Sequence, residues 1–235
     1  YSFLQFNRDT MTEVALIDHN GEGEATANIQ LCTAHWYGGN REQSCENTVK
    51  SVKKLLGGIQ IDGYYELNMS EIPKLNNMVD GVTVTVEDDF SKKYPKMKKG
   101  ATINLDDEQA YAYVHDRYGV GNEENTSRMK RQQQYMTGFF KKLQEKVKAN
   151  PNYANEVFES LQDVSTTDIT IGKISNISNI FASGTDKGIF ELAGKSKIGQ
   201  ALGDEIDHME FYVNKKAMVS TMSELFGIVE QKNKE

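Results

Sequence analysis

Alternating apolar and polar residues predict β-strands at several places along the chain. The alternation is clearest at Val82-Thr83-Val84-Thr85-Val86, where every second side chain is apolar. Further strands are predicted at residues 2–6, 13–17, 59–67, 189–192 and 209–213. Each of these short segments is expected to contribute one strand to the fold.

Apolar residues spaced three and four apart predict helices between these strands. The apolar positions from 49 to 56 share one face of a helix that follows Ser44 as a cap and stops at Gly57-Gly58. Asp106 and Gln109 resemble a capping box ahead of a helix that runs through Val114. Two further helices are predicted around residues 174–181 and 218–229. Strands and helices therefore alternate along the chain.

A longer helix is predicted between Thr126 or Ser127 and Asn150-Pro151, because the residue before a proline is disfavoured in a helix. Its buried side is expected to carry Met129, Met136, Phe140, Leu143 and Val147. The lysine-rich residues 92–99 are expected to form a solvated loop.

The order of these elements favours an α/β fold, with one three-layer α/β/α domain whose mixed central sheet is flanked by helices. No repeat, low-complexity tract or linker interrupts the chain. We expect this domain to cover residues 1–231, with residues 232–235 as a frayed tail.

Composition narrows the functional classes. The chain has 235 residues, of which 38% are hydrophobic and 26% charged, and its formal net charge is −7. An acidic chain is a poor general binder of polyanions, so we expect no nucleic-acid partner, and any phosphate site must be local. The longest aliphatic run, Val14 to Ile17, is far shorter than the ~20 residues needed to cross a bilayer.

Two cysteines, Cys32 and Cys45, flank a turn-rich stretch, and neither belongs to a CxxC motif or a Cys/His metal spacing. Two interpretations are open. The thiols are unrelated core residues, or they form a disulfide that closes a short loop and contributes about 3 kcal/mol on the chain-entropy model. A disulfide would place the protein outside a reducing cytosol, and we favour it.

The candidate chemistry concentrates at the start of the long helix. Arg128, Arg131, Gln132 and Tyr135 follow helical spacing and are expected to share one face, opposite the Met/Phe side. A helix N-terminus with guanidinium groups suits a phosphate or pyrophosphate. The alternative is an exposed basic helix start, although cations there oppose the helix dipole.

Two further clusters carry cationic side chains. His115 and Arg117 end the helix before the long one, and they point the same way if the chain leaves that helix in an extended form. Arg8 and Asp9 follow the first predicted strand. Taken alone, the first cluster is compatible with a basic helix terminus, and the second with a surface ion pair worth under ~1 kcal/mol.

Five motifs in this order resemble the LytR/CpsA/Psr family. They are Asn7-Arg-Asp-Thr-Met11; the Tyr37-Gly-Gly39 turn before Glu46-Asn-Thr-Val49; Gly81-Val-Thr-Val-Thr-Val-Glu-Asp-Asp-Phe90; Leu105-Asp-Asp-Glu-Gln-Ala110 with Tyr113-Val-His-Asp-Arg117; and Ser127-Arg-Met-Lys-Arg-Gln-Gln-Gln134. The resemblance runs to about residue 147 and continues more loosely to the end. No one of these motifs is specific, but five in register are.

The resemblance implies an enzyme, a phosphotransferase that moves a glycopolymer from a polyprenyl pyrophosphate carrier to peptidoglycan with Mg2+ or Mn2+. Such a protein would act at the extracellular face of a Gram-positive cell membrane, on a teichoic-acid-like or capsular polymer. It would be held by a membrane anchor outside this chain. The polyprenyl tail would lie in an apolar tunnel between sheet and helices.

The resemblance also implies roles for individual residues. Arg8, Asp9, Arg117 and Arg128 would be catalytic, and Asp9 would hold the metal or act on the acceptor hydroxyl. The substrate-binding set would be Arg8, His115, Arg117, Arg128, Arg131 and Gln132. Some family members carry a cysteine pair at the positions of Cys32 and Cys45, which supports the disulfide.

The chain departs from the family pattern at several positions. His115 stands where an arginine is usual, Gln30 where a basic residue is common, and Asn125 where an aspartate is frequent, with Glu123 and Glu124 nearby. The family's preceding strands and their metal-binding aspartate are expected to be absent, because the chain is a fragment or because the protein has lost that half.

These departures keep a second hypothesis open, a catalytically impaired protein of the same fold that binds polyprenyl phosphate or glycopolymer or has a regulatory role. A third, a cytoplasmic nucleotide hydrolase, is weakened because the chain has no GxxxxGK[ST] loop. Of the remaining histidines, we expect His19 and His208 to be structural and His35, just before the Tyr37-Gly38-Gly39 turn, to approach the site.

Overall fold

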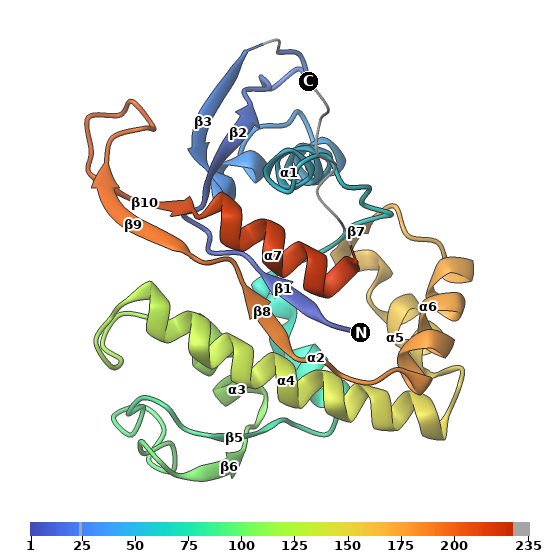
Figure 1. Cartoon of the computed structure of the whole chain (residues 1–235). Helices are drawn as coiled ribbons and strands as arrows, with labels where there is room; N and C mark the ends of the chain where they lie inside the picture. Colours follow the sequence, from blue (N-terminus) through green and yellow to red (C-terminus); the bar gives the residue numbers. More distant parts are fainter. Residues whose placement is uncertain (24, 228–235) are drawn as a thin grey trace. The chain divides into compact units, whose positions relative to one another are not determined.

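The computed structural model describes residues 1–23 and 25–227, and it confirms the α/β class (Figure 1). The chain divides into two compact units. We call the first the α4 unit, formed by residues 1, 67–165 and 169–186, and the second the α1 unit, formed by residues 2–66 and 166–168 and by the chain from residue 187 onwards. The predicted domain boundary at residue 231 and the predicted tail lie outside the described residues.

The α4 unit is mostly helical. Its elements are η2 (Met69–Glu71), α2 (Ile72–Met78), β5 (Thr83–Thr85), β6 (Thr102–Asn104), α3 (Asp107–His115), α4 (Asn125–Ala149), α5 (Tyr153–Ser160), η3 (Gln162–Val164) and α6 (Ile171–Ser183). The long helix α4 packs against α3, β5, α5 and α6 (Figure 1).

The α1 unit contains most of the strands. Its elements are β1 (Phe3–Gln5), β2 (Met11–Ala15), β3 (Thr26–Gln30), η1 (Leu31–His35), α1 (Arg41–Leu55), β8 (Ile189–Glu191), β9 (Gly194–Gly199), β10 (His208–Val213) and α7 (Lys215–Phe226). Two short strands, β4 (Tyr65–Leu67) and β7 (Ser165–Thr167), pair with each other.

The described strands pair two by two, where one central sheet was expected. The pairing is mixed, as predicted: β1 and β8 are parallel, with Phe3 opposite Ile189, whereas β2–β3, β5–β6 and β9–β10 are antiparallel. A parallel bridge between Thr10 and Phe211 also joins the start of β2 to β10.

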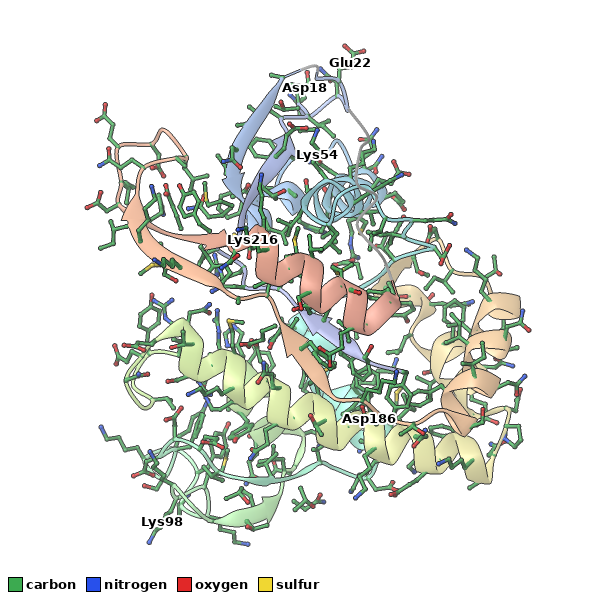
Figure 2. All side chains as sticks on the ribbon, viewed as in Figure 1. Asp18, Glu22, Lys54, Lys98, Asp186 and Lys216 are labelled. Atoms are coloured by element: carbon green, nitrogen blue, oxygen red, sulfur yellow. The ribbon has the colours of Figure 1, made fainter. Side chains whose placement is uncertain are left out.

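The core of the α4 unit follows the predicted pattern of apolar and polar positions. In the α4 unit, Val82, Val84 and Val86 are buried while Thr83 and Thr85 are exposed, so the alternation places one face of β5 in the core. The lysine-rich residues 92–99 form the predicted loop between β5 and β6, and Lys98 points away from the ribbon (Figure 2). Met97, within this loop, is fully buried in the same core.

The predicted helix ends vary in accuracy. The capping box is confirmed: Asp106 accepts from the Gln109 backbone N–H, and the Gln109 side chain accepts from the Asp106 N–H. The cap predicted at Ser44 is wrong, because Asn40 caps α1 and Ser44 lies inside the helix. Lys54, near the end of α1, lies 3.2 Å from the Glu13 carboxylate on β2 (Figure 2).

The buried side predicted for the long helix is partly wrong. The fully buried positions of α4 are Arg131, Tyr135, Phe139 and Val147. Met136, which we expected inside, is exposed. The helix turns a polar residue, Arg131, and the amphipathic Tyr135 inward because the protein supplies hydrogen-bond partners for both, which a hydrophobic pattern cannot reveal.

Within residues 1–23 and 25–227, none of the helices combines the length and the apolar character needed to cross a membrane.

Candidate functional site

Arg131 fastens the start of α4 to the end of α3. Its two terminal nitrogens each donate at 2.6 Å to a backbone carbonyl, one of Tyr113 and one of Asp116, and its Nε lies 3.2 Å from the Asp88 carboxylate. The guanidinium also lies over the Phe90 ring, 5.0 Å from the centroid. These contacts use the planar, multi-donor shape of arginine, which lysine cannot reproduce.

This placement differs from the prediction that Arg131 contacts substrate. The residue is only 1% exposed, and its donors are directed at protein groups. Burial lowers the pKa of Arg131, which the Asp88 carboxylate opposes and the nearby Arg128 reinforces. Arg131 is therefore a positioning residue that orders the two helix ends.

Arg128 lies one helical turn before Arg131 and is half-buried. Its guanidinium donates at 2.7 Å to the Asn125 side-chain oxygen, so the asparagine at the expected aspartate position still orients an arginine. Gln132 donates at 3.0 Å to the Val114 carbonyl and thereby adds a second link to α3. Of the two arginines in the predicted motif, Arg128 is the more exposed.

The chain between α3 and α4 carries the second predicted cluster. Arg117 donates at 2.6 Å to the Tyr118 hydroxyl, and its guanidinium lies 4.5 Å from the centroid of that exposed ring. His115 stacks on Tyr111, with the ring centroids 4.7 Å apart, and its Nδ1 lies 3.2 Å from an Asp116 carboxylate oxygen. The α4 unit thus has Arg117 and Arg128 at neighbouring helix ends.

The third cluster, Arg8 and Asp9, lies in the α1 unit in a tightly held turn. The Asn7 side chain accepts from the Asp9 N–H at 3.0 Å. The Arg8 carbonyl accepts from the Cys32 N–H at 3.0 Å, and the Asp9 carbonyl accepts from the Phe211 N–H at 2.7 Å. Backbone bonds therefore fix both residues between η1 and β10.

The Asp9 carboxylate is the group through which this turn could bind a metal. Arg8 Nε lies 3.5 Å from it. Mg2+ at phosphoryl-transfer sites takes one or two carboxylates together with phosphate oxygens and waters. One half-buried carboxylate beside an arginine fits an ion that arrives with phosphate oxygens, and by itself it does not form a complete cage.

The predicted disulfide between Cys32 and Cys45 is wrong, because both thiols are free in the structure. Cys32 Sγ lies 3.8 Å from an Arg8 guanidinium nitrogen, whereas Cys45 Sγ lies 4.0 Å from His35 Nε2. The turn-rich stretch between them holds each sulfur against a different partner. Gln30 is also buried, and it donates at 3.2 Å to the Met209 carbonyl.

The surroundings of Cys45 contain a donor set that the sequence analysis missed. His35, Cys45 and Glu66 each bring one metal-ligating atom, and these atoms lie within 4.8 Å of one another. Burial raises the pKa of the Cys45 thiol, and the nearby Glu66 carboxylate raises it further. The residues are far apart in sequence and follow no spaced motif, so only the fold reveals them.

A surface hollow of about 520 Å³ in the α4 unit is lined by polar residues. Among them are Asn76, Asn77, Asp80, Asp106, Asp107 and Glu108. Carboxylates and amides do not suit a polyprenyl tail, so this hollow is not the predicted apolar tunnel, which stays a prediction.

Comparisons with solved structures find the same fold. The chain resembles an Enterococcus faecalis protein described as a transcriptional regulator, with a TM-score of 0.70, 19% identity and coverage of 97% of this chain and 78% of the other. Bacillus subtilis TagV matches with a TM-score of 0.67, 20% identity and coverage of 96% and 83%. A structure of TagT bound to LI-WTA matches with a TM-score of 0.66, 21% identity and coverage of 96% and 78%.

The search of curated protein sequences found no match. A family model gives the assignment: that of the LytR_cpsA_psr family matches residues 1–226, and the five sequence motifs fall within this range. The chain therefore belongs to the LytR/CpsA/Psr family.

Proposed function

We propose that this protein transfers a glycopolymer from a polyprenyl pyrophosphate carrier to peptidoglycan. Two findings support the proposal. The chain belongs to the LytR/CpsA/Psr family, and one solved structure of similar fold is TagT bound to LI-WTA. In this proposal the protein works at the extracellular face of the membrane.

The observation that carries the proposal is that Arg117 follows the end of α3 and Arg128 lies in the first turn of α4, near the link that Arg131 makes between these two helices. Arg128 is oriented by Asn125 and Arg117 by Tyr118, while the buried Arg131 holds both helix ends in place. A pyrophosphate brings several negative charges, and guanidinium groups held by other residues neutralise them without reorganising. The net charge of −7 makes such a local cationic feature stand out.

The reaction exchanges the phosphoanhydride bond of the carrier for a phosphodiester bond to the acceptor. The acceptor hydroxyl oxygen forms a bond to the phosphorus that carries the glycopolymer, and the bond from that phosphorus to the bridging oxygen breaks. Polyprenyl phosphate leaves with the bond electrons, and the hydroxyl proton passes to a carboxylate base. Arg117 and Arg128 would bind the phosphate oxygens on which negative charge builds up.

A divalent ion, Mg2+ or Mn2+, would neutralise further phosphate charge when bound with the substrate. Whether Asp9 holds this ion or acts instead on the acceptor hydroxyl stays a prediction; its carboxylate suits an ion that also takes phosphate oxygens. The roles of Arg8, His115 and Gln132 in substrate binding stay predictions.

Binding of polyprenyl phosphate to the purified chain tests the site. Arg128→Ala should weaken that binding at least about tenfold, because a charged hydrogen-bond partner of a phosphate contributes about 1.5–3 kcal/mol. Lys130→Ala, a change at an exposed cation on the same helix, is the matched control and should leave the affinity within about twofold. Equal affinity of Arg128→Ala and the unchanged protein would remove Arg128 from the site.

Turnover separates the transferase from the alternative, a binding or regulatory protein of the same fold. The departures at Gln30 and His115, where the family carries more basic residues, favour this alternative. The assay supplies a polyprenyl-pyrophosphate-linked glycan, a peptidoglycan fragment and Mg2+, and it follows release of polyprenyl phosphate by mass spectrometry. Metal-dependent release that Asp9→Asn abolishes supports the transferase, whereas Arg128-dependent binding without release supports the alternative.

A further inference from the structure

Three side chains from separate elements of the α1 unit lie close together, and Cys45 is one of them. His35 is the last residue of η1, Cys45 lies in the first half of α1, and Glu66 is the middle residue of β4. Their ligating atoms lie within 4.8 Å of one another, and His35 Nε2 is 4.0 Å from Cys45 Sγ. An imidazole nitrogen, a sulfur and a carboxylate oxygen therefore lie close together.

This mixture of donors selects a class of ion. Nitrogen and sulfur ligands are typical of Zn2+ and related transition metals, whereas Mg2+ and Ca2+ require oxygen ligands. With Zn–ligand bonds of about 2.0–2.3 Å, tetrahedral ligand atoms lie roughly 3.3–3.8 Å apart. The separations between the donor atoms would need to shorten by up to about 1.5 Å, which side-chain rotation supplies.

The elements that carry the donors are themselves well fixed. Asn40 caps α1, accepting from the Gln43 N–H at 2.9 Å, and the Gln43 side chain accepts from the Gly39 N–H at 2.8 Å. A Cβ on Gly38 would lie 2.6 Å from the Ser44 hydroxyl oxygen, so glycine lets the turn after His35 approach α1 closely. The geometry around Cys45 therefore does not depend on a flexible loop.

The neighbouring charges favour a cation. Arg41 pairs with Oε2 of Glu66, which orients this carboxylate beside the other two donors. The Glu42 and Glu46 carboxylates also lie close enough to act electrostatically on the Cys45 sulfur. Near the Cys45 sulfur, the Glu42, Glu46 and Glu66 carboxylates therefore outnumber the single guanidinium of Arg41.

We propose that His35, Cys45 and Glu66 bind one zinc ion, with the fourth coordination position open to water or a further ligand. Binding would replace the Cys45 thiol proton by the metal and release that proton to solvent. The ion would connect η1, α1 and β4. This site is separate from the Mg2+ role proposed for Asp9, and it does not depend on the proposed transferase activity.

Metal titration of the purified chain after treatment with a chelator tests the proposal. We expect one Zn2+ per chain, measured against a competing chromophoric chelator. Co2+ should bind at the same site and give a thiolate-to-cobalt charge-transfer band. Cys45→Ser should abolish the band and weaken Zn2+ binding by roughly 100-fold or more, because it removes the thiolate ligand.

Cys32→Ser is the matched control, since it removes the other thiol of the chain and should keep both the band and the Zn2+ affinity. His35→Gln and Glu66→Gln preserve size and should each weaken Zn2+ binding at least about tenfold while retaining the cobalt–thiolate band. If circular dichroism shows that Cys45→Ser is unfolded, the His35→Gln and Glu66→Gln variants test the proposal in its place. Zn2+ binding that none of the three ligand variants changes, or no binding by the unchanged chain, would overturn the proposal.

Discussion

At the scale of single residues, the same sequence spacing leads to two different roles. Arg128 and Arg131 are one turn apart on α4, and the sequence pattern treats them alike. Arg131 is nevertheless buried, with its donors directed at two carbonyls and its Nε beside Asp88, whereas Arg128 is half-buried and oriented by Asn125. The partners of Arg131 come from α3 and from the chain after β5, and their proximity is a property of the fold.

Arg131→Lys should lower the free energy of unfolding by about 2–4 kcal/mol. An ammonium group on a flexible stem cannot reach both carbonyls and Asp88 at once, so buried acceptors are left unpaired. Urea unfolding measures the change, and Lys130→Gln, at an exposed neighbour, should stay within about 0.5 kcal/mol. Equal stability of Arg131→Lys and the unchanged protein would contradict the structural role of Arg131.

Tyr113 predicts how stability depends on alkaline pH. Burial raises its pKa to about 12, and its hydroxyl donates at 2.6 Å to Gln134. Between about pH 10, where an unfolded tyrosine titrates, and pH 12, the folded protein keeps a proton that the unfolded chain loses. Stability therefore falls as the pH rises through this range, by up to about 3 kcal/mol from Tyr113.

Unfolding free energies at about pH 9 and pH 11.5 measure this dependence. Tyr113→Phe should be less stable at the lower pH, because the hydroxyl contacts are lost, but it should lose less stability between the two values. Part of the loss should remain, since burial also raises the pKa of Tyr135. An unchanged difference between the two pH values in Tyr113→Phe would show that Tyr113 does not titrate as expected.

At the scale of elements, local patterns identified most of the helices and strands that carry apolar repeats. The capping box of α3 was predictable because both partners lie within four residues of each other. By contrast, β9 reads Gly-Lys-Ser-Lys-Ile-Gly and shows no apolar alternation, so its strand form depends on pairing with β10. Sequence patterns have the same limit at the candidate sites. The arginine motif could be predicted from spacing, but the pairing of Asp88 with Arg131, and of Glu66 with His35 and Cys45, depends on the fold.

The packing of α1 depends on one buried amide. The Asn47 side-chain nitrogen lies within hydrogen-bond distance of three carbonyls, those of Ala15 at 2.9 Å, Ala34 at 2.9 Å and Tyr37 at 3.2 Å. It connects α1 to β2, η1 and the turn before α1. The asparagine of the Glu46-Asn-Thr-Val49 motif is therefore explained by backbone satisfaction.

Asn47→Asp should lower the free energy of unfolding by about 3 kcal/mol or more at neutral pH. The change replaces the donor by a carboxylate oxygen that faces three carbonyls without water. Glu46→Gln, at the exposed neighbouring position, changes the charge by one unit without burial and should have little effect. Chemical denaturation compares the two, and a similar small effect in both would argue against the role of Asn47.

At the scale of the whole molecule, the net charge of the chain and the charge of the proposed binding residues have opposite signs. The formal net charge of −7 repels polyanions, whereas the proposed ligand of Arg117 and Arg128 is a phosphate. Electrostatic screening reconciles the two, because the Debye length at ~0.15 M salt is about 8 Å and charges farther away contribute little. Binding should thus depend on the few cations near the phosphate and very little on the total charge.

Glu145→Lys separates these contributions. Glu145 is exposed on α4 and lies about 25 Å from Arg128 along the helix, at 1.5 Å per residue. At ~0.15 M salt the change should alter the affinity for polyprenyl phosphate in neutral micelles by less than about twofold, although it raises the net charge by as much as two added cations. Arg128→Ala, which lowers that charge by one, should weaken binding at least about tenfold. Heparin, a polyanion without a lipid, should not retain the unchanged chain at this salt concentration. If Glu145→Lys instead strengthened binding as much as Arg128→Ala weakened it, the interaction would follow net charge, and the arginines at the ends of α3 and α4 would lose their assigned role.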